Sequence, residues 1–193
     1  QDAPFIFSAC PDNPGMLLLN ASAFASASEA EKRFHMAAAM THLKLGTLPL
    51  VTLPHENIIM VISGLLGLYD EKLAMPDVLS RIKSFLPRHL RKTIVEFITT
   101  QGIASFQYDP IQLQYAASVL DANIGHLFSA DLCASIMALM RRKKPNLHIP
   151  AQPQQLLAHY ANMPNVPGLF AFNTSERFSE MRQQLGLFLK MTT

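Results

Sequence analysis

The sequence predicts an all-α fold, a single globular domain of about eight helices around a buried central helix (57–69), with an extended N-terminal arm. Three observations predict it. Apolar residues recur at helical spacing, and Ser, Asp, Pro and Gly mark the ends of these segments. No segment sustains the alternation of a strand, so we expect no sheet beyond a short pairing of the arm. Residues 57–69 carry no charge and are apolar all round the helical wheel, which is typical of a buried helix.

The composition narrows the class of protein. The 193 residues are 49% hydrophobic and 16% charged, so the chain can bury a sizeable core. A net charge of +2 gives no global attraction to nucleic acid or membrane. Cys10 and Cys133 show neither metal nor disulfide spacing, and we find no signal or transmembrane segment, which together indicate an intracellular, cytoplasmic protein. The chain opens with Gln1 rather than Met, so we expect a fragment or a processed product.

The N-terminal quarter is predicted to be an arm followed by a helix. Residues 1–25 hold two apolar clusters separated by turn residues, and this arm packs either on its own domain or on a neighbouring one. Ser28 and Glu31 fit a capping box, and Gly46 fits a C-terminal cap, so we expect a helix between them. The residues predicted to face inward are Phe34, Ala37, Ala38, Thr41 and Leu45.

The middle of the chain is divided by prolines and glycines. A loop runs to Pro54 and the central helix follows, with a patch of small residues that lets another helix approach closely: Ser63, Gly64 and Gly67. Asp77 caps a short helix that Pro87 breaks, and Gly102 ends the helix after it. The residues predicted to face inward in these two helices are Val78, Leu79, Ile82, Phe85, Leu86, Leu90, Ile94, Phe97 and Ile98.

The C-terminal half is predicted to hold four more helices. The pair Asp109-Pro110 starts a helix that ends at Gly125, and Ser129 caps the next one. Residues 145–152 and 164–173 are expected to be loops, with a short helix at 153–163 between them. The last helix starts near Asn173 or Thr174 and buries Phe178, Met181, Leu185 and Phe188. A soft boundary at 145–152 divides the chain into an arm (1–25), a helical core (26–145) and a smaller C-terminal helical unit (146–193), unless it is one domain throughout.

Basic residues gather in two clusters, which we predict to bind an acidic protein or RNA. Their members are Arg81, Lys83, Arg88, His89, Arg91, Lys92, Arg141, Arg142, Lys143 and Lys144. No acidic residue interrupts the run from Arg81 to Lys92. Two plainer explanations stay open: the first cluster can be the solvated face of two amphipathic helices, and the second can be the cations that favour a helix C-terminus.

Motifs for catalysis and metal binding are missing from the sequence. No two histidines have the i, i+4 spacing of a helical metal site; His35 and His42 lie two turns apart. No phosphate-binding glycine loop is found, and Ser63 lacks the flanking glycine of a nucleophile elbow. We therefore expect no metal, no cofactor and no enzymatic activity, with a helical enzyme of scattered residues as the third alternative.

The two chain ends complete the hypothesis. Both are apolar, and the residues predicted to mediate self-association are Phe5, Ile6, Phe7, Leu187 and Phe188; the alternative is that both ends fold over their own core. The sequence thus favours a non-enzymatic structural or interaction protein, a homo-oligomer that uses its basic face on an acidic protein or RNA. In design it resembles a nucleocapsid or matrix subunit. The alternative is a monomeric adaptor that grips a helix or peptide in an apolar groove. Peripheral membrane contact stays open.

Overall fold

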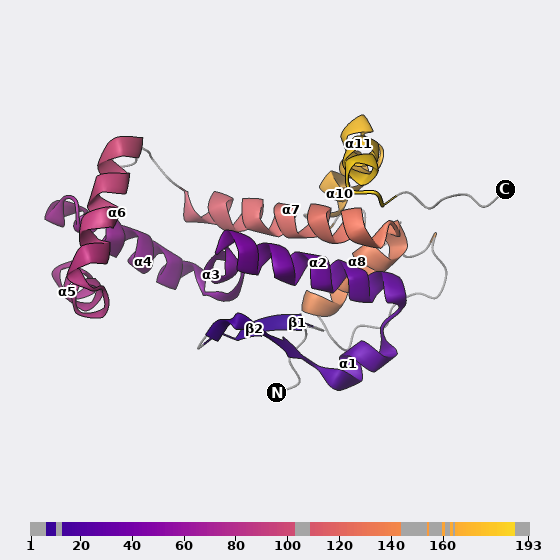
Figure 1. Cartoon of the computed structure of the whole chain (residues 1–193), viewed down its shortest axis with the longest axis horizontal. Helices are drawn as coiled ribbons and strands as arrows, with labels where there is room; N and C mark the ends of the chain where they lie inside the picture. The colour runs from indigo at the N-terminus through magenta and orange to yellow at the C-terminus, as the bar shows by residue number, and fades with distance from the viewer. Residues whose placement is uncertain are drawn as a thin grey trace. The chain divides into compact units, whose positions relative to one another are not determined.

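The computed structural model describes residues 7–10, 13–102, 109–143 and 165–187, together with positions 154, 160 and 163. Figure 1 labels its elements. The all-α prediction is confirmed, because every described element except one small hairpin is a helix.

The chain falls into two compact units. The first combines residues 1–48 with residues 116–193, and the second is the continuous segment 49–115. The sequence instead predicts divisions at loops, into residues 1–25, 26–145 and 146–193. That division stays a prediction.

The first unit begins with an antiparallel hairpin. Strand β1 (Phe7–Cys10) pairs with β2 (Asn13–Leu19), and Phe7 lies opposite Leu19. Both strands contact helix α2 (Glu29–Leu45) of the same unit. Helix α1 (Ala21–Ser26) follows β2 in the chain, and the Asn20 side chain caps it by accepting from the Ala23 N–H at 3.0 Å. The expected arm is therefore paired near its start, as predicted, but it is helical at its end because Asn20 supplies an N-cap that we did not recognise.

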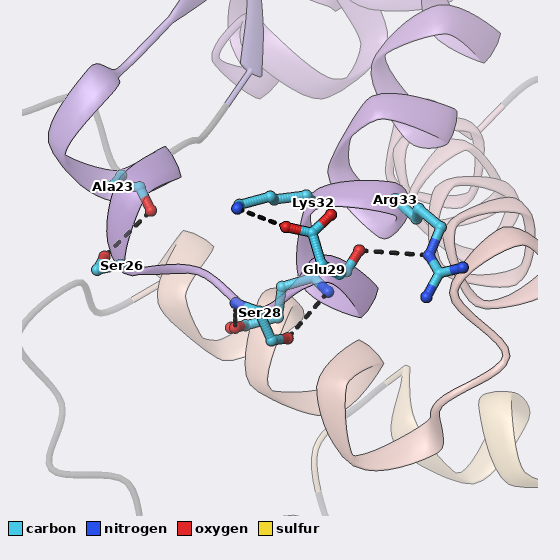
Figure 2. A network of polar contacts seen from close by, with 7 residues as sticks. Ala23, Ser26, Ser28, Glu29, Lys32 and Arg33 are labelled. Carbon is cyan, nitrogen blue, oxygen red and sulfur yellow. Dashed lines mark hydrogen bonds and ion pairs between the residues drawn. The ribbon is translucent and has the colours of Figure 1, made fainter.

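The start of α2 confirms the predicted capping box. The Ser28 hydroxyl accepts from the Glu31 N–H at 3.2 Å, and the Glu31 carboxylate accepts from the Ser28 N–H at 2.9 Å. Figure 2 shows the surroundings of this box, where Lys32 Nζ pairs with Glu29 Oε1 at 2.7 Å. The same Lys32 ammonium lies 4.6 Å from the centre of the Phe24 ring on α1, so a cation–π contact joins the first two helices.

The core of the first unit lies between four helices. Helices α2, α7 (Pro110–Ser129), α8 (Leu132–Lys143) and α10 (Val166–Asn173) supply its buried side chains, which include Phe34, Ala122, Ile136, Met140 and Leu169. A Cβ atom at Gly125 would lie 2.6 Å from the ring of Phe34. Gly125 is therefore a site of close helix packing, and α7 continues past it to Ser129. The prediction that the helix ends at Gly125 is wrong for this reason.

Three more predicted boundaries in this unit need correction. Ser129 is the last residue of α7, and it is Asp131 Oδ1 that caps α8 by accepting from the Ala134 N–H at 2.9 Å. The predicted loop at 164–173 is largely helix α10, because a proline in the first turn, Pro167, loses no helical hydrogen bond. The last helix is α11 (Glu176–Gln184), capped by Ser175. The predicted helix 153–163 lies almost entirely outside the described residues.

The second unit is a set of short helices around α4 (His55–Gly67). It contains α3 (Leu48–Thr52), the 3-10 helix η1 (Glu71–Leu73), α5 (Pro76–Phe85) and α6 (Arg88–Gln101). Helix α4 contacts η1, α5 and α6. A Cβ at Gly64 would lie 2.7 Å from Ile82 Cγ1, and one at Gly67 would lie 2.5 Å from Ala74 Cβ. The predicted close approach at the small residues of α4 is confirmed.

The predicted burial of residues 57–69 on every side is wrong. Ile58 and Leu66 are buried, but Ile59, Met60 and Val61 are exposed. The helices that cover α4 are short and leave part of its circumference open. The fully buried large side chains belong instead to the first unit, around Phe34. Helix α3 is a further difference, since it occupies part of the expected loop that ends at Pro54.

Candidate interaction surface

The first basic cluster lies on α5 and α6, within the second unit. Pro76 starts α5 in the first helical turn, and Pro87 separates α5 from α6. The corner around Pro87 follows from the sequence, because proline cannot continue α5 but is tolerated at the start of α6. Between Val78 and Val95 the chain carries Arg81, Lys83, Arg88, Arg91 and Lys92 and no carboxylate. The predicted acid-free run therefore spans two helices joined at a corner.

These basic residues differ in their pairing. Lys83 Nζ lies 2.7 Å from Glu71 Oε1, and Lys92 Nζ lies 3.8 Å from Glu96 Oε1. Arg81, Arg88 and His89 are exposed, and none of them makes an ion pair with a described residue. Arg91 is half-buried, and its Nε has no hydrogen-bond acceptor among the residues that are described. The charge that remains available to a partner is thus mainly that of the arginines.

The start of α6 has an unusual charge distribution for a helix. Its N-cap residue Pro87 makes no side-chain hydrogen bond, and its first turn holds no acidic residue. Arg88 and His89 occupy this turn instead. The free N–H groups of a helix N-terminus carry positive partial charge, so acidic residues stabilise this position and cations do not. The stability of α6 therefore does not explain the cations at its start.

Large apolar side chains lie exposed beside these cations. Phe85 is 82% exposed, Phe97 57% and Leu90 42%. The sequence periodicity predicted all three to face inward, and the structure corrects this: Leu79 and Ile98 fill the buried positions of α5 and α6. The periodicity identifies an apolar side of each helix, but the second unit has too few layers to cover all of it. In the first unit, Leu45 and Leu185 are also exposed, although both were predicted to face inward.

Exposed apolar side chains are concentrated in the second unit. Among the described residues, thirteen of the eighteen exposed large hydrophobic side chains belong to it: Val51, Ile59, Met60, Val61, Tyr69, Leu73, Met75, Phe85, Leu90, Phe97, Ile111, Leu113 and Tyr115. Its buried hydrophobic residues are Ile58, Leu66, Leu79 and Ile98. Exposed patches beyond a few hundred Å² are uncommon on monomers and are typical of interaction sites. The second unit therefore exposes more of its large apolar side chains than it buries, which is typical of a surface that binds a partner.

The second basic cluster belongs to the first unit and has a different environment. Arg141 is half-buried, and its Nη1 lies 3.2 Å from Oε1 of the buried Glu31. This pair joins α8 to α2, so Arg141 already has a partner in its own chain. The side chains of Arg142 and Lys143, and the whole of Lys144, lie outside the described residues.

The predicted self-association residues are only partly described. Phe5, Ile6 and Phe188 lie outside the described residues, and for Phe7 only the backbone in β1 is described. Leu187 is half-buried, and its carbonyl oxygen accepts a hydrogen bond from Arg182. The same guanidinium donates to the carbonyl oxygen of Leu127 in α7. The chain just after α11 is therefore tied to the first unit through Arg182.

A buried histidine network in the first unit was not identified from the sequence. His126 Nδ1 lies 2.9 Å from Ser135 Oγ, and His126 Nε2 lies 2.7 Å from Asn173 Oδ1. The Phe178 ring stacks on the imidazole, with ring centres 4.9 Å apart. Burial lowers the pKa of His126, and the Arg182 charge acts in the same direction, while the hydrogen bond to Asn173 opposes them. The neutral imidazole of His126 joins α7 to Ser135 of α8 and to Asn173 at the end of α10. This network explains why these three buried or half-buried positions are polar.

A second histidine joins α2 to α7. His42 Nε2 lies 3.2 Å from Asp121 Oδ1, and His42 Nδ1 lies 2.9 Å from Thr47 Oγ1. His42 and Asp121 are both buried. The order Thr–His–Asp is that of a nucleophile, a base and an orienting acid. These contacts make the arrangement a polar tie between two core helices.

The described residues also bear on metal binding and on membrane insertion. They contain no group of three or more His, Cys, Asp or Glu side chains placed to hold a metal ion. None of their helices combines the length and hydropathy needed to cross a bilayer. Cys133 is a free, half-buried thiol, and burial raises its pKa.

Comparison with protein families, with curated proteins and with solved structures found no match to this chain.

Proposed function

We propose that this chain is a non-enzymatic α-helical interaction protein that self-associates and binds an acidic partner through α5 and α6. The observation that carries the proposal is the set of exposed apolar side chains in residues 49–115, which lie among exposed arginines that make no ion pair with a described residue. Aromatic side chains present about 150–250 Å² each, so the exposed fractions of Tyr69, Phe85, Phe97 and Tyr115 alone correspond to roughly 350–600 Å², and the exposed aliphatic side chains add to this area. A stable interface takes about 800 Å² from each partner.

The apolar area supports self-association, and the arginines support a partner of opposite charge. An RNA partner would make the chain similar in design to a nucleocapsid or matrix subunit. A monomer that binds one partner through the same surface would be an adaptor, which is the second candidate. Both candidates place the function on residues 49–115, and they differ in oligomeric state.

The test is light scattering after size exclusion, at two protein concentrations, with the absorbance ratio at 260 and 280 nm read across each peak. We expect a mass above that of one chain that rises with concentration. A monomer at both concentrations would contradict self-association and favour the adaptor. A high absorbance ratio in the oligomer peak would identify nucleic acid as the acidic partner.

Charge reversal locates the partner site. In the variant with Arg88, Arg91 and Lys92 changed to Glu, partner binding and its salt dependence should both be lost. Truncation of residues 1–19 tests a separate point, the part played by the arm: if the arm mediates assembly, the truncated chain becomes monomeric. A truncated chain that still assembles would leave residues 49–115, or the C-terminal Leu187 and Phe188, as the site of self-association.

A further inference from the structure

The corner between α5 and α6 combines exposed arginines, exposed apolar side chains and a positive charge that is local to it. Together these three features indicate one kind of partner. Arg81 and Phe85 are four residues apart on α5 and share its exposed face. Arg88 and His89 follow directly after Pro87, at the start of α6. An exposed aromatic ring thus has, on each side of it in the chain, an exposed arginine that forms no ion pair with any residue the structure describes.

The apolar part of this surface continues along α6. Leu90 and Phe97 are seven residues apart, which places them two turns apart on one side of the helix, and both are exposed. This spacing is that of apolar anchors in helix-to-helix contacts. An aliphatic side chain such as Leu90 has no aromatic plane on which a nucleobase can stack, so the stripe fits an apolar protein side chain better than a base.

The charge balance also distinguishes between acidic partners. Residues 49–115 contain six Lys or Arg and six Asp or Glu, so the second unit as a whole has no excess positive charge to attract a polyanion: Lys72, Arg81, Lys83, Arg88, Arg91 and Lys92 against Glu56, Asp70, Glu71, Asp77, Glu96 and Asp109. The positive charge is local to the α5–α6 corner. A few carboxylates match a few arginines, whereas a phosphate backbone is bound by an extended basic groove.

We infer that the α5–α6 corner is the docking site of an acidic amphipathic helix of another protein. Carboxylates of that helix pair with Arg81 and Arg88, and its apolar face covers Phe85, Leu90 and Phe97. The inference rests on the proposed function and gives its acidic partner a chemical class. It also accounts for the cations at the start of α6, which the helix itself does not favour.

The test is fluorescence anisotropy of labelled probes with the full chain. The first probe is a model helix of Glu, Leu and Ala, about 18 residues long so that it can form a helix in isolation. The second has the same composition in an order that destroys amphipathicity, and the third is an oligouridylate of matched length. We expect the amphipathic peptide to bind at least about tenfold more tightly than the rearranged one.

Matched variants test the assignment of residues. Arg81→Glu with Arg88→Glu should weaken peptide binding at least about tenfold. The control Lys44→Glu with Lys72→Glu makes the same change in net charge at exposed lysines elsewhere and should leave binding unchanged. Phe85→Ala should also weaken binding, whereas Met36→Ala, at another exposed position, should not. Circular dichroism checks that each variant is folded.

Four results would overturn the inference. Equal binding of the two peptides would show that charge alone is sensed, and unchanged binding by the Arg81 and Arg88 variant would place the site elsewhere. If oligouridylate binds more tightly than either peptide, and the Arg81 and Arg88 variant loses that binding, the partner is RNA and not a helix. The proposed function would then stand. Failure of every probe would remove the acidic partner from the proposed function as well, and light scattering would still decide self-association.

Discussion

At the scale of single residues, the core of the first unit depends on the absence of a Cβ atom at Gly125. Helix α7 passes the Phe34 ring at a distance that leaves no room for a Cβ, which would lie 2.6 Å from ring carbons. Gly125→Ala should therefore lower the free energy of unfolding by about 1–3 kcal/mol, because a fully buried ring has to move. Urea denaturation measures the loss.

The matched control is Gly168→Ala in α10, where no atom of the described residues, apart from the chain neighbours and the backbone of the same helix, lies within 4 Å of a new Cβ. Alanine is a better helix former than glycine, so this variant should be slightly more stable than the natural chain. Equal effects of the two substitutions would contradict the close packing of Phe34 on α7.

His126 gives a pH dependence with a defined sign. Its pKa in the folded chain lies below the ordinary 6.5, because burial disfavours the imidazolium. When the pH falls below about 6.5, the unfolded chain takes up a proton that the folded chain resists, so folding stability is lost. The contribution is at most about 1.4 kcal/mol per pH unit.

Urea denaturation between about pH 7.5 and pH 5.5 tests this prediction against His126→Gln. The other histidines contribute to both proteins, so the difference between the two slopes isolates His126. A natural chain that loses no more stability than the variant would show that the imidazole is not held neutral.

At the scale of elements, the helix ends are the part of the fold that short stretches of sequence determine. The capping box of Ser28 and Glu31 and the glycine caps at Gly46 and Gly102 were predicted and are confirmed, because each depends on residues within one turn. The cap of α8 was placed at Ser129 instead of Asp131, since both are good caps and only the packed structure distinguishes them.

The α8 cap can be tested directly. Asp131→Ala removes the acceptor of the Ala134 N–H and should cost about 0.5–2 kcal/mol of stability, whereas Asp131→Asn keeps an acceptor oxygen and should cost little. Thermal unfolding compares the two. A similar loss in both variants would mean that the charge of Asp131, and not its hydrogen bond, stabilises this helix end.

The candidate surface was predicted less completely than the helix ends. The run of basic residues from Arg81 to Lys92 is visible in the sequence, but the pairing of Lys83 with Glu71 depends on how η1 meets α5. The exposure of Phe85 was not predictable from its helical spacing, because periodicity shows which side is apolar and not whether another layer covers it.

At the scale of the whole molecule, the two units differ in the depth of their cores. Among the described residues, the large side chains with essentially no exposure, such as Phe34, Ile136 and Leu169, all belong to the first unit. Local opening costs less where few apolar contacts are lost. Backbone amides of 49–115 should therefore exchange with deuterium faster than those of α2 and α8, as hydrogen-exchange mass spectrometry can measure. Equal protection in the two units would contradict this difference.

Within residues 49–115, exposed positions tolerate substitution more readily than packed ones. Most substitutions at an exposed position leave the fold intact, so drift at Phe85 or Arg88 is limited only by what the surface binds. Gly64 and Gly67 have no such freedom, since α5 and Ala74 occupy the space next to them. In a lineage that lost the partner, the glycines would persist while the aromatic and basic residues of the corner were replaced. The pattern of substitution across related chains would thus distinguish the residues that pack inside this unit from the exposed residues that contact a partner.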